Sequence, residues 1–262
     1  MIQRLKAHLK AWLSRTLWAY DADALVRQLR SMGVQPGSTL MVHSSWQAHS
    51  GFNGKPAELV DALKRTVGES GLLVMTSMPY HNMSSAEWLA KGKPMNIRRS
   101  PSMMGLVSEV FRRSSGVHRS LSVTHPLLAW GQDAEAFLAD HDKTDKPFGG
   151  DSPFAKLLER DAILLGYDAP FSTFTFTHFV EDQLAETLPV GLYEAETQQG
   201  KVIDEDGNQH TQNVYVLSAE ANRLRREHRL VTHLKTDGSL QESKIGNTQL
   251  VWIQAQALLT GA

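Results

Sequence analysis

A histidine and a glutamate three residues apart are the first side chains whose types and spacing could do chemistry. His178 and Glu181 lie in the stretch T-F-T-H-F-V-E-D at positions 175–182. Residues at this spacing share one face of a helix, so the carboxylate can orient the imidazole and stabilise it after proton uptake. The pair follows the apolar segment at 162–166, and catalytic groups of α/β sheets favour the carboxyl ends of strands. An ordinary pair of surface side chains has the same spacing, so the spacing alone leaves both interpretations open.

Motifs for metal, serine and cysteine chemistry are absent. A zinc helix of the form H-x-x-E-H would need a second histidine where this chain has Asp182, and H-E-x-x-H does not occur. The G-x-S-x-G motif of serine hydrolases is also missing. The chain has no cysteine, which excludes disulfides, thiolate zinc sites and cysteine nucleophiles. We therefore expect no metal site and no serine or cysteine nucleophile.

The loop from Ser44 to Lys55 is a second candidate for ligand binding. It contains Gly51 and Gly54 and leads into a predicted helix that begins at Pro56. A helix N-terminus attracts anions through its unpaired N–H groups, and glycines let the backbone approach a ligand closely. The loop matches neither the Walker A pattern nor G-x-G-x-x-G, so by pattern alone a plain strand-to-helix connection is the simpler interpretation.

The elements that must position these groups alternate between strands and helices. Strands are predicted at 38–43, 71–77, 127–130 and 162–166, and helices at 21–32, 56–67, 104–113, 152–159, 174–188, 218–230 and 249–259. The order strand, helix, strand over 38–77 predicts a parallel βαβ unit. Residues 79–100 are predicted to form a long ordered loop. The Asp206-Gly207 pair between alternating apolar residues predicts a β-hairpin near 195–217. A single domain over residues 1–262 with this hairpin excursion is the simplest organisation.

The composition excludes several classes of partner. The 262 residues carry 27 basic and 28 acidic side chains, a net charge of -1, which argues against a nucleic-acid binder. The arginines between 223 and 229 are mixed with Glu227 and are interpreted as a solvated helix face. No apolar run approaches the roughly 20 residues that span a bilayer, and no signal peptide pattern is visible. We expect a soluble, cytoplasmic protein.

An amphipathic helix is predicted within residues 1–20. Leu5, Leu9, Leu13 and Leu17 recur at four-residue spacing, with lysines and arginines between them. Packing against the core or against a second subunit is the ordinary interpretation, which makes a homodimer plausible. A helix that lies on a membrane surface is the alternative.

Several segments occur in one particular order along the chain. They are 33–46 (G-V-Q-P-G-S-T-L-M-V-H-S-S-W), 59–63 (L-V-D-A-L), 71–75 (G-L-L-V-M), 100–113 (S-P-S-M-M-G-L-V-S-E-V-F-R-R), 147–149 (P-F-G), 152–157 (S-P-F-A-K-L), 163–166 (I-L-L-G), 175–181 (T-F-T-H-F-V-E) and 244–247 (K-I-G-N). This ordered set resembles the aminoglycoside 3-N-acetyltransferase family, which is distinct from the GNAT acetyltransferases. The segment at 175–181 is similar to the family's T-x-x-H-x-x-E signature.

The resemblance implies an N-acetyltransferase that uses acetyl-CoA and has a three-layer α/β/α core around a central mixed, partly parallel sheet. His178 would take the proton from the attacking amine of an amino sugar. Glu181 would orient His178 or hold the acceptor. Thr175 would help to polarise the thioester carbonyl or contact the cofactor. Direct transfer, without a covalent acyl-enzyme, is consistent with the missing cysteine.

The resemblance also implies the remaining site residues. Ser44 and Ser45, with the loop that holds Gly51 and Gly54, would contact the pantetheine or pyrophosphate of the cofactor. His125 looks like a histidine found in some members and is expected to contact the substrate.

Three departures from the family pattern bear on the acceptor. Ser122 stands where many members carry the histidine of R-S-x-H-P, and Ser172 where an Asn or Asp is usual. The segment 91–99 is basic where many resistance enzymes show an acidic residue. Polycationic aminoglycosides favour acidic pockets. The acceptor is therefore expected to be an aminoglycoside or an amino sugar of a polysaccharide precursor. A CoA- or sugar-binding module, and a transferase for another acyl donor, are the alternatives.

Overall fold

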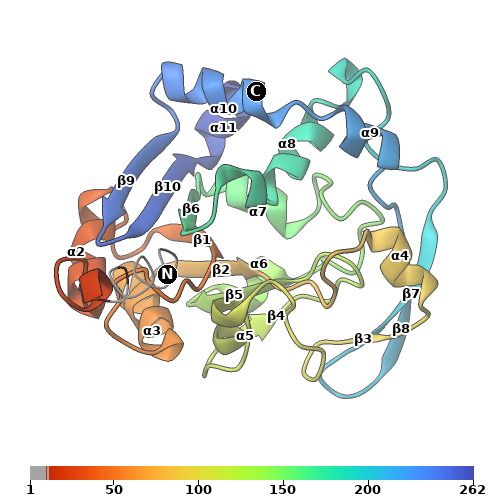
Figure 1. Cartoon of the computed structure of the whole chain (residues 1–262). Coiled ribbons are helices and arrows are strands. Elements are labelled where there is room, and N and C mark those ends of the chain that lie inside the picture. Colours follow the sequence, from red (N-terminus) through yellow and green to blue (C-terminus); the bar gives the residue numbers. More distant parts are fainter. Residues whose placement is uncertain (1–9, 11) are drawn as a thin grey trace, which may run out of the picture.

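A seven-stranded mixed sheet forms the centre of the computed structural model, which describes residue 10 and residues 12–262. The strand order is β4-β5-β2-β1-β6-β10-β9 (Figure 1). The strands are β1 (Thr39–Ser44), β2 (Leu72–Thr76), β4 (His118–Arg119), β5 (Leu127–Gly131), β6 (Ile163–Tyr167), β9 (Gln241–Ile245) and β10 (Thr248–Gln254). β1 pairs in parallel with β2 and β6, whereas the other pairs in this sheet are antiparallel. The predicted βαβ unit and the partly parallel sheet are confirmed.

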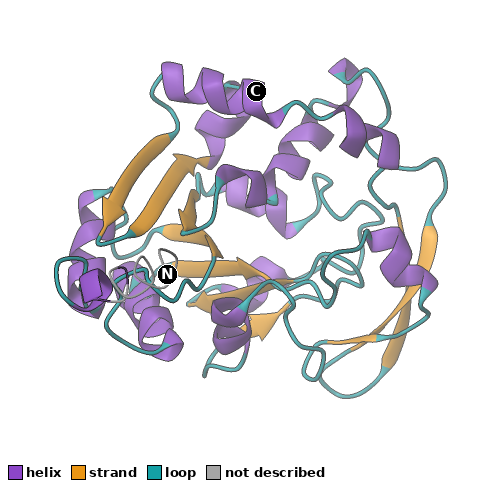
Figure 2. Cartoon of the chain, in the orientation of Figure 1, coloured by secondary structure: helices purple, strands orange, loops and turns teal. Residues whose placement is uncertain are grey.

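Helices cover both faces of this sheet (Figure 2). On one face lie α2 (Ala22–Ser31), α3 (Pro56–Val67) and α5 (Leu106–Arg112), and on the other α6 (Ala134–Leu138), α7 (Pro153–Glu159), α8 (Phe176–Gln183), α10 (Glu227–Thr236) and α11 (Ala255–Thr260). Leu40 and Val42 of β1 point into the apolar core under α2, α3 and α5, whereas Met41 between them points into the core on the opposite face of the sheet. A strand buried on both faces is apolar at every position, as this one is. The three-layer α/β/α architecture is therefore confirmed.

A smaller sheet lies beside this core and contains the predicted hairpin. It has the order β3-β7-β8, formed by β3 (Met95–Asn96), β7 (Gln198–Ile203) and β8 (Gln209–Val214). β7 and β8 pair antiparallel around Asp206-Gly207, so the hairpin near 195–217 is confirmed. Helix α4 (Ser85–Ala90) packs on β7 over a third apolar cluster.

Two predictions in the middle of the chain are wrong. Residues 79–100 are not a continuous loop, because they contain α4 and β3. Ser84 and Glu87 form a reciprocal capping box that starts α4. The helix predicted at 174–188 ends at Gln183 and is followed by a 3-10 turn at Ala185–Thr187.

Two further corrections fall near the C-terminus. The helix predicted at 218–230 is two helices, α9 (Ala219–Leu224) and α10, because Arg225 adopts an extended backbone with ψ 133 between them. The helix predicted at 249–259 is mostly strand β10, which pairs with β6 on one side and β9 on the other, and only α11 is helical. Strand β4 and helix α6 were not predicted.

Half of the segment in which the N-terminal helix is predicted, residues 1–9 and 11, lies outside the described residues, and residues 12–15 of the other half are helical. Of the part that is described, Trp12 and Leu17 have exposed side chains. The next helix, α2, begins as predicted, with the Asp21 carboxylate accepting a hydrogen bond from the N–H of Ala24. In residues 12–262, no helix is long and apolar enough to cross a membrane.

Candidate active site

His178 and Glu181 lie on one face of α8, the helix that follows β6. Phe176, Phe179 and Val180 turn to the opposite side of the helix and are buried in the core. This amphipathic pattern leaves the two polar side chains together on the less buried face. His178 Nδ1 lies 3.0 Å from Glu181 Oε2. The two side chains are therefore paired in space as well as in sequence.

Arg225 joins this pair from a distant part of the chain. Its Nε donates to Glu181 Oε1 at 2.7 Å, and its Nη2 donates to Glu181 Oε2 at 2.6 Å. The same Nη2 lies 2.8 Å from His178 Nδ1. The interpretation of residues 223–229 as a solvated helix face is therefore wrong for Arg225. It is right for Arg223, Arg226 and Arg229, which are exposed.

The pKa values of His178 and Glu181 are each set by influences that raise them and others that lower them. Burial lowers the pKa of His178, the hydrogen bond to Glu181 raises it, and the charge of Arg225 lowers it, so that the pKa lies below its ordinary value. Burial raises the pKa of Glu181, but hydrogen bonds from His178 and Arg225 outweigh burial and hold it below its usual range. The carboxylate is thus ionised and the imidazole favours its neutral form, which is the form that can accept a proton.

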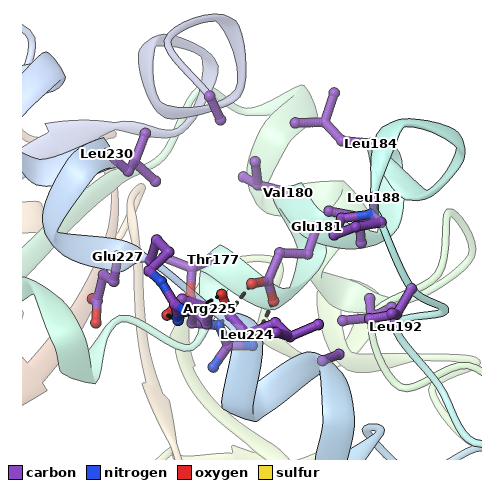
Figure 3. Close-up of a pocket in the computed structure, with 15 residues that line it drawn as sticks. Thr177, Val180, Glu181, Leu184, Leu188, Leu192, Leu224, Arg225, Glu227 and Leu230 are labelled. Carbon is purple, nitrogen blue, oxygen red and sulfur yellow. Dashed lines mark hydrogen bonds and ion pairs between the residues drawn. The ribbon is translucent and has the colours of Figure 1, made fainter.

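An apolar cavity of about 310 Å³ lies against the Glu181–Arg225 ion pair (Figure 3). Leu184, Leu188 and Leu224 are among the side chains that surround it. The side chains of Glu181 and Arg225 are themselves only 23% and 27% exposed, and electrostatic interactions are stronger where water is partly excluded. The ion pair is therefore held in a partly dry environment.

His125 is close to His178, with the ring of Phe148 next to both. The ring centroids of Phe148 lie 4.7 Å from His125 and 5.1 Å from His178. Burial is the main cause that lowers the pKa of His125 to about 3, and a proton on the nearby His178 lowers it as well. Its Nε2 lies 3.3 Å from the hydroxyl of Tyr80, and the hydroxyl of Ser122 accepts a hydrogen bond from its backbone N–H at 3.2 Å. His125 is consequently a neutral, fixed side chain.

A larger cavity of about 830 Å³ opens at the carboxyl ends of β1 and β6. Ser44, Ser45 and Thr175 all line it, so three predicted cofactor residues share one cavity. Gly51 and Gly54 do not line it and instead border a separate cavity of about 380 Å³. Gly51 has a φ of 97° and packs against the backbone of Trp18, where no side chain would fit.

His43 is a site residue that the sequence interpretation missed. Its Nε2 accepts a hydrogen bond from the backbone N–H of Thr175 at 3.1 Å, and its ring stacks on Phe174 at 5.0 Å. Burial lowers the pKa of His43 to about 3, so it stays neutral. A histidine at the end of the apolar run L-M-V-H is the one sequence signal that could have identified it. It also lines the larger cavity, and it fixes the start of α8.

The family model described as aminoglycoside 3-N-acetyltransferase matches residues 41–262. The chain belongs to this family. A prophage-derived aminoglycoside N(3')-acetyltransferase-like protein of Bacillus subtilis is 27% identical over 188 residues, which cover 66% of this chain and 69% of the relative. Aminoglycoside N(3)-acetyltransferase VIII of Streptomyces fradiae is 31% identical over 171 residues, covering 60% of this chain and 59% of that protein. The match thus spans less than two thirds of the Streptomyces enzyme.

Solved acetyltransferase structures share the fold. The aminoglycoside acetyltransferase AAC(3)-Xa aligns with a TM-score of 0.80 and 22% identity over 98% of this chain and 95% of its own. The complex of AAC-IIIb with CoASH aligns with a TM-score of 0.78 and 24% identity over 92% of this chain and 94% of its own. The architecture of the family therefore extends over nearly the whole chain.

Proposed function

We propose that this protein transfers an acetyl group from acetyl-CoA to an amine of an amino sugar, with His178 as the general base. The observation that carries the proposal is the His178–Glu181 pair on α8, three residues after the Thr175 that lines the larger cavity. Membership of the family supports the reaction class. The complex of the related fold AAC-IIIb with CoASH supports the choice of donor.

Proton transfer is the main task of the protein side chains in this reaction. An alkylammonium group first loses one proton to water, and the neutral amine then releases a second proton as it attacks, which a neutral imidazole can accept. Acetyl-CoA supplies a thioester whose C–S bond breaks as the C–N bond forms, and the proton released by the amine ends on the departing thiol. His178 holds that proton in between. Glu181 stabilises the imidazolium through Nδ1–H.

The larger cavity fits the donor. Its volume of about 830 Å³ lies in the range of cofactor sites, and its hydroxyls can bind a pantetheine chain or a pyrophosphate. We assign Ser44 and Ser45 to these contacts, and Thr175 to the thioester end because it is the residue at the start of α8. Gly51 and Gly54 would act through the shape of the loop, because they lie outside the cavity.

Two features of charge, one at the His178–Glu181 pair and one on the basic segment 91–99, bear on the choice of acceptor. Glu181 is already neutralised by Arg225, and Lys91, Lys93, Arg98 and Arg99 are exposed on the segment 91–99. Neither feature favours a polycation. We therefore infer that an amino sugar with few positive charges, such as a polysaccharide precursor, is a better acceptor than an aminoglycoside. His125 and Glu181 are the residues expected to contact it.

Release of free thiol from acetyl-CoA across a panel of aminoglycosides and nucleotide-linked amino sugars tests the proposal. Turnover with one acceptor class is expected. His178→Ala should reduce it by roughly 10²–10⁴-fold, the usual contribution of a proton-transfer group, without unfolding the protein. The matched control is His233→Ala, since His233 is an exposed histidine on α10. Undiminished turnover in His178→Ala would remove His178 from the mechanism, and cofactor binding without any turnover would favour a CoA-binding module.

A further inference from the structure

Arg225 reaches the catalytic pair from the junction between α9 and α10, 44 residues beyond Glu181. Ser218 begins α9, and its N–H donates to the carbonyl of Leu192 at 2.8 Å. The next N–H, of Ala219, donates to the carboxylate of Glu194 at 3.0 Å. α9 has no buried residue. Nothing in the apolar core therefore requires an arginine at 225, and its polar contacts must account for its position.

Two of those contacts go to the Glu181 carboxylate and one goes to the imidazole of His178. The guanidinium binds both oxygens of Glu181 and places a second N–H of Nη2 at His178 Nδ1. Nδ1 can donate to Glu181 or accept from Arg225, but it cannot do both at once. Proton uptake at the other ring nitrogen requires Nδ1 to donate to Glu181. Arg225 thus bears directly on the protonation of the proposed base.

Among the charged groups around His178, Arg225 is the one whose charge disfavours the imidazolium. Glu181 lies on the same helix, and Arg225 comes from the α9–α10 junction. Glu227, at the start of α10, interacts with the charges of both Arg225 and Glu181. His125, from the segment before β5, is neutral because burial lowers its pKa to about 3.

The loop that carries Phe148 also carries Lys146. The ammonium of Lys146 lies 5.8 Å from the centre of the Tyr193 ring, and its charge acts on Asp182. Its contacts are therefore with a different acidic group of α8, the neighbour of Glu181 that points elsewhere.

We propose that Arg225 is a positioning residue for the proposed transfer, which fixes the Glu181 carboxylate and keeps His178 neutral until the amine delivers its proton. Two effects act in the same direction. A positive charge beside an imidazole disfavours the imidazolium, and an arginine paired with the carboxylate weakens the attraction that would otherwise favour it. The inference rests on the proposed function only for the identity of the proton donor. The contacts themselves do not depend on it.

Titration of the imidazole signals of isotope-labelled protein by NMR tests the placement without any acceptor. The full chain is compared with Arg225→Met and Arg225→Lys, and with Arg223→Met as the control, because Arg223 is exposed on α9 two residues earlier and its guanidinium lies 3.7 Å from Glu220. Arg225→Met should raise the titration midpoint of His178 by about one pH unit or more, since a charge within a few ångströms has this effect. Arg225→Lys should restore most of the wild-type midpoint, and Arg223→Met should leave it unchanged.

The pH profile of kcat/KM supplies the second readout. In Arg225→Met the acidic limb should move to higher pH together with the His178 midpoint, while the KM for acetyl-CoA stays the same. A wild-type His178 midpoint in Arg225→Met, or a limb that does not move with the midpoint, overturns the inference. Arg225→Gln replaces the methionine variant if that protein does not fold. Failure to find any acceptor would refute the transfer reaction but leave the NMR result to decide the role of Arg225.

Discussion

The chemistry of His178 depends on a balance between one carboxylate and one guanidinium. Both lie within 3.0 Å of the same ring nitrogen, and both are themselves joined by two hydrogen bonds. A carboxylate alone would favour the imidazolium, whereas the arginine and burial favour the neutral ring. A histidine in this environment is suited to the proposed role, because it is neutral before it accepts a proton and has a partner for its protonated form.

Replacing Glu181 by glutamine tests this balance at the residue scale. Glu181→Gln removes the charge that stabilises the imidazolium, so the pKa of His178 should fall further and turnover should fall by about 10²-fold. NMR titration and thiol release measure the two effects. Glu186→Gln is the matched control, because Glu186 is exposed one turn further along the chain. Turnover that survives in Glu181→Gln would mean that the carboxylate does not assist the base.

His43 gives a second prediction at this scale. The side chain accepts the N–H of Thr175, and this buried N–H would lose its partner in His43→Leu. A buried donor without a partner costs roughly 1–3 kcal/mol. Urea unfolding at neutral pH should show a loss of that order in His43→Leu and a smaller loss in His43→Gln, whose amide oxygen can still accept. Equal stability of the leucine variant and the wild type would contradict the assigned bond.

At the scale of elements, the β7–β8 hairpin supports the segment that carries His125. The Gln212 side chain of β8 accepts a hydrogen bond from the N–H of Val123 at 2.9 Å and donates to the carbonyl of Leu121 at 3.0 Å. Gly200 of β7 packs against Val123 as well. The hairpin therefore supports the segment that forms one wall of the proposed active site.

Gly200→Val should displace this hairpin. A Cβ atom at residue 200 would lie 2.5 Å from a methyl group of Val123 and 2.6 Å from one of Leu89, both buried. Overpacking of this kind costs about 1–3 kcal/mol. Thermal unfolding should report that loss, with a fall in acetyl transfer as His125 moves. Lys201→Val, at the exposed neighbour on the same strand, is the control and should change neither. A Gly200→Val protein as stable as the control would contradict the packing argument.

Local signals predicted the elements whose ends are encoded nearby. α2 begins at the Asp21 cap and α3 at Pro56, because a cap or an N-terminal proline acts within one turn. β10 was predicted as helix, since a short apolar run does not distinguish a buried strand from a buried helix until its neighbours are known. Helix α4 was missed although its capping box is local, because the surrounding Pro, Met and Asn residues indicated a loop.

In the candidate active site, too, only the contacts made between residues close in sequence could be predicted. His178 and Glu181 were found because their contact is made within one turn of one helix. Arg225 was not, because the fold brings it from 44 residues away and its neighbours in sequence are exposed arginines. The contact between His43 and Thr175 spans 132 residues and is likewise a product of the sheet order.

At the scale of the whole molecule, the fold buries several histidines without opposite charges. His43, His125 and His141 are at most 6% exposed. Burial lowers the pKa of His43 to about 3, of His125 to about 3 and of His141 to about 4. An unfolded histidine has a pKa near 6.5, so on acidification the unfolded chain binds these protons before the folded one does.

Acidification should therefore unfold this protein at an unusually high pH. Above pH ~6.5 none of the three histidines makes the free energy of unfolding depend on pH. As the pH falls below that value, each lowers the free energy of unfolding by about 1.4 kcal/mol per pH unit, until its folded pKa is reached. Urea unfolding at a series of pH values from 7.5 to 4.5 should show a steep fall that begins well above the range in which carboxylates titrate. His141→Gln keeps a group that can bond Ser120 but does not titrate, so its stability should fall less steeply by about 1.4 kcal/mol per pH unit, whereas the exposed His228→Gln should follow the wild type. Stability that stays constant from pH 7.5 to 5 would show that these side chains are protonated in the folded protein and that the neutral site inferred around His125 and His178 is wrong.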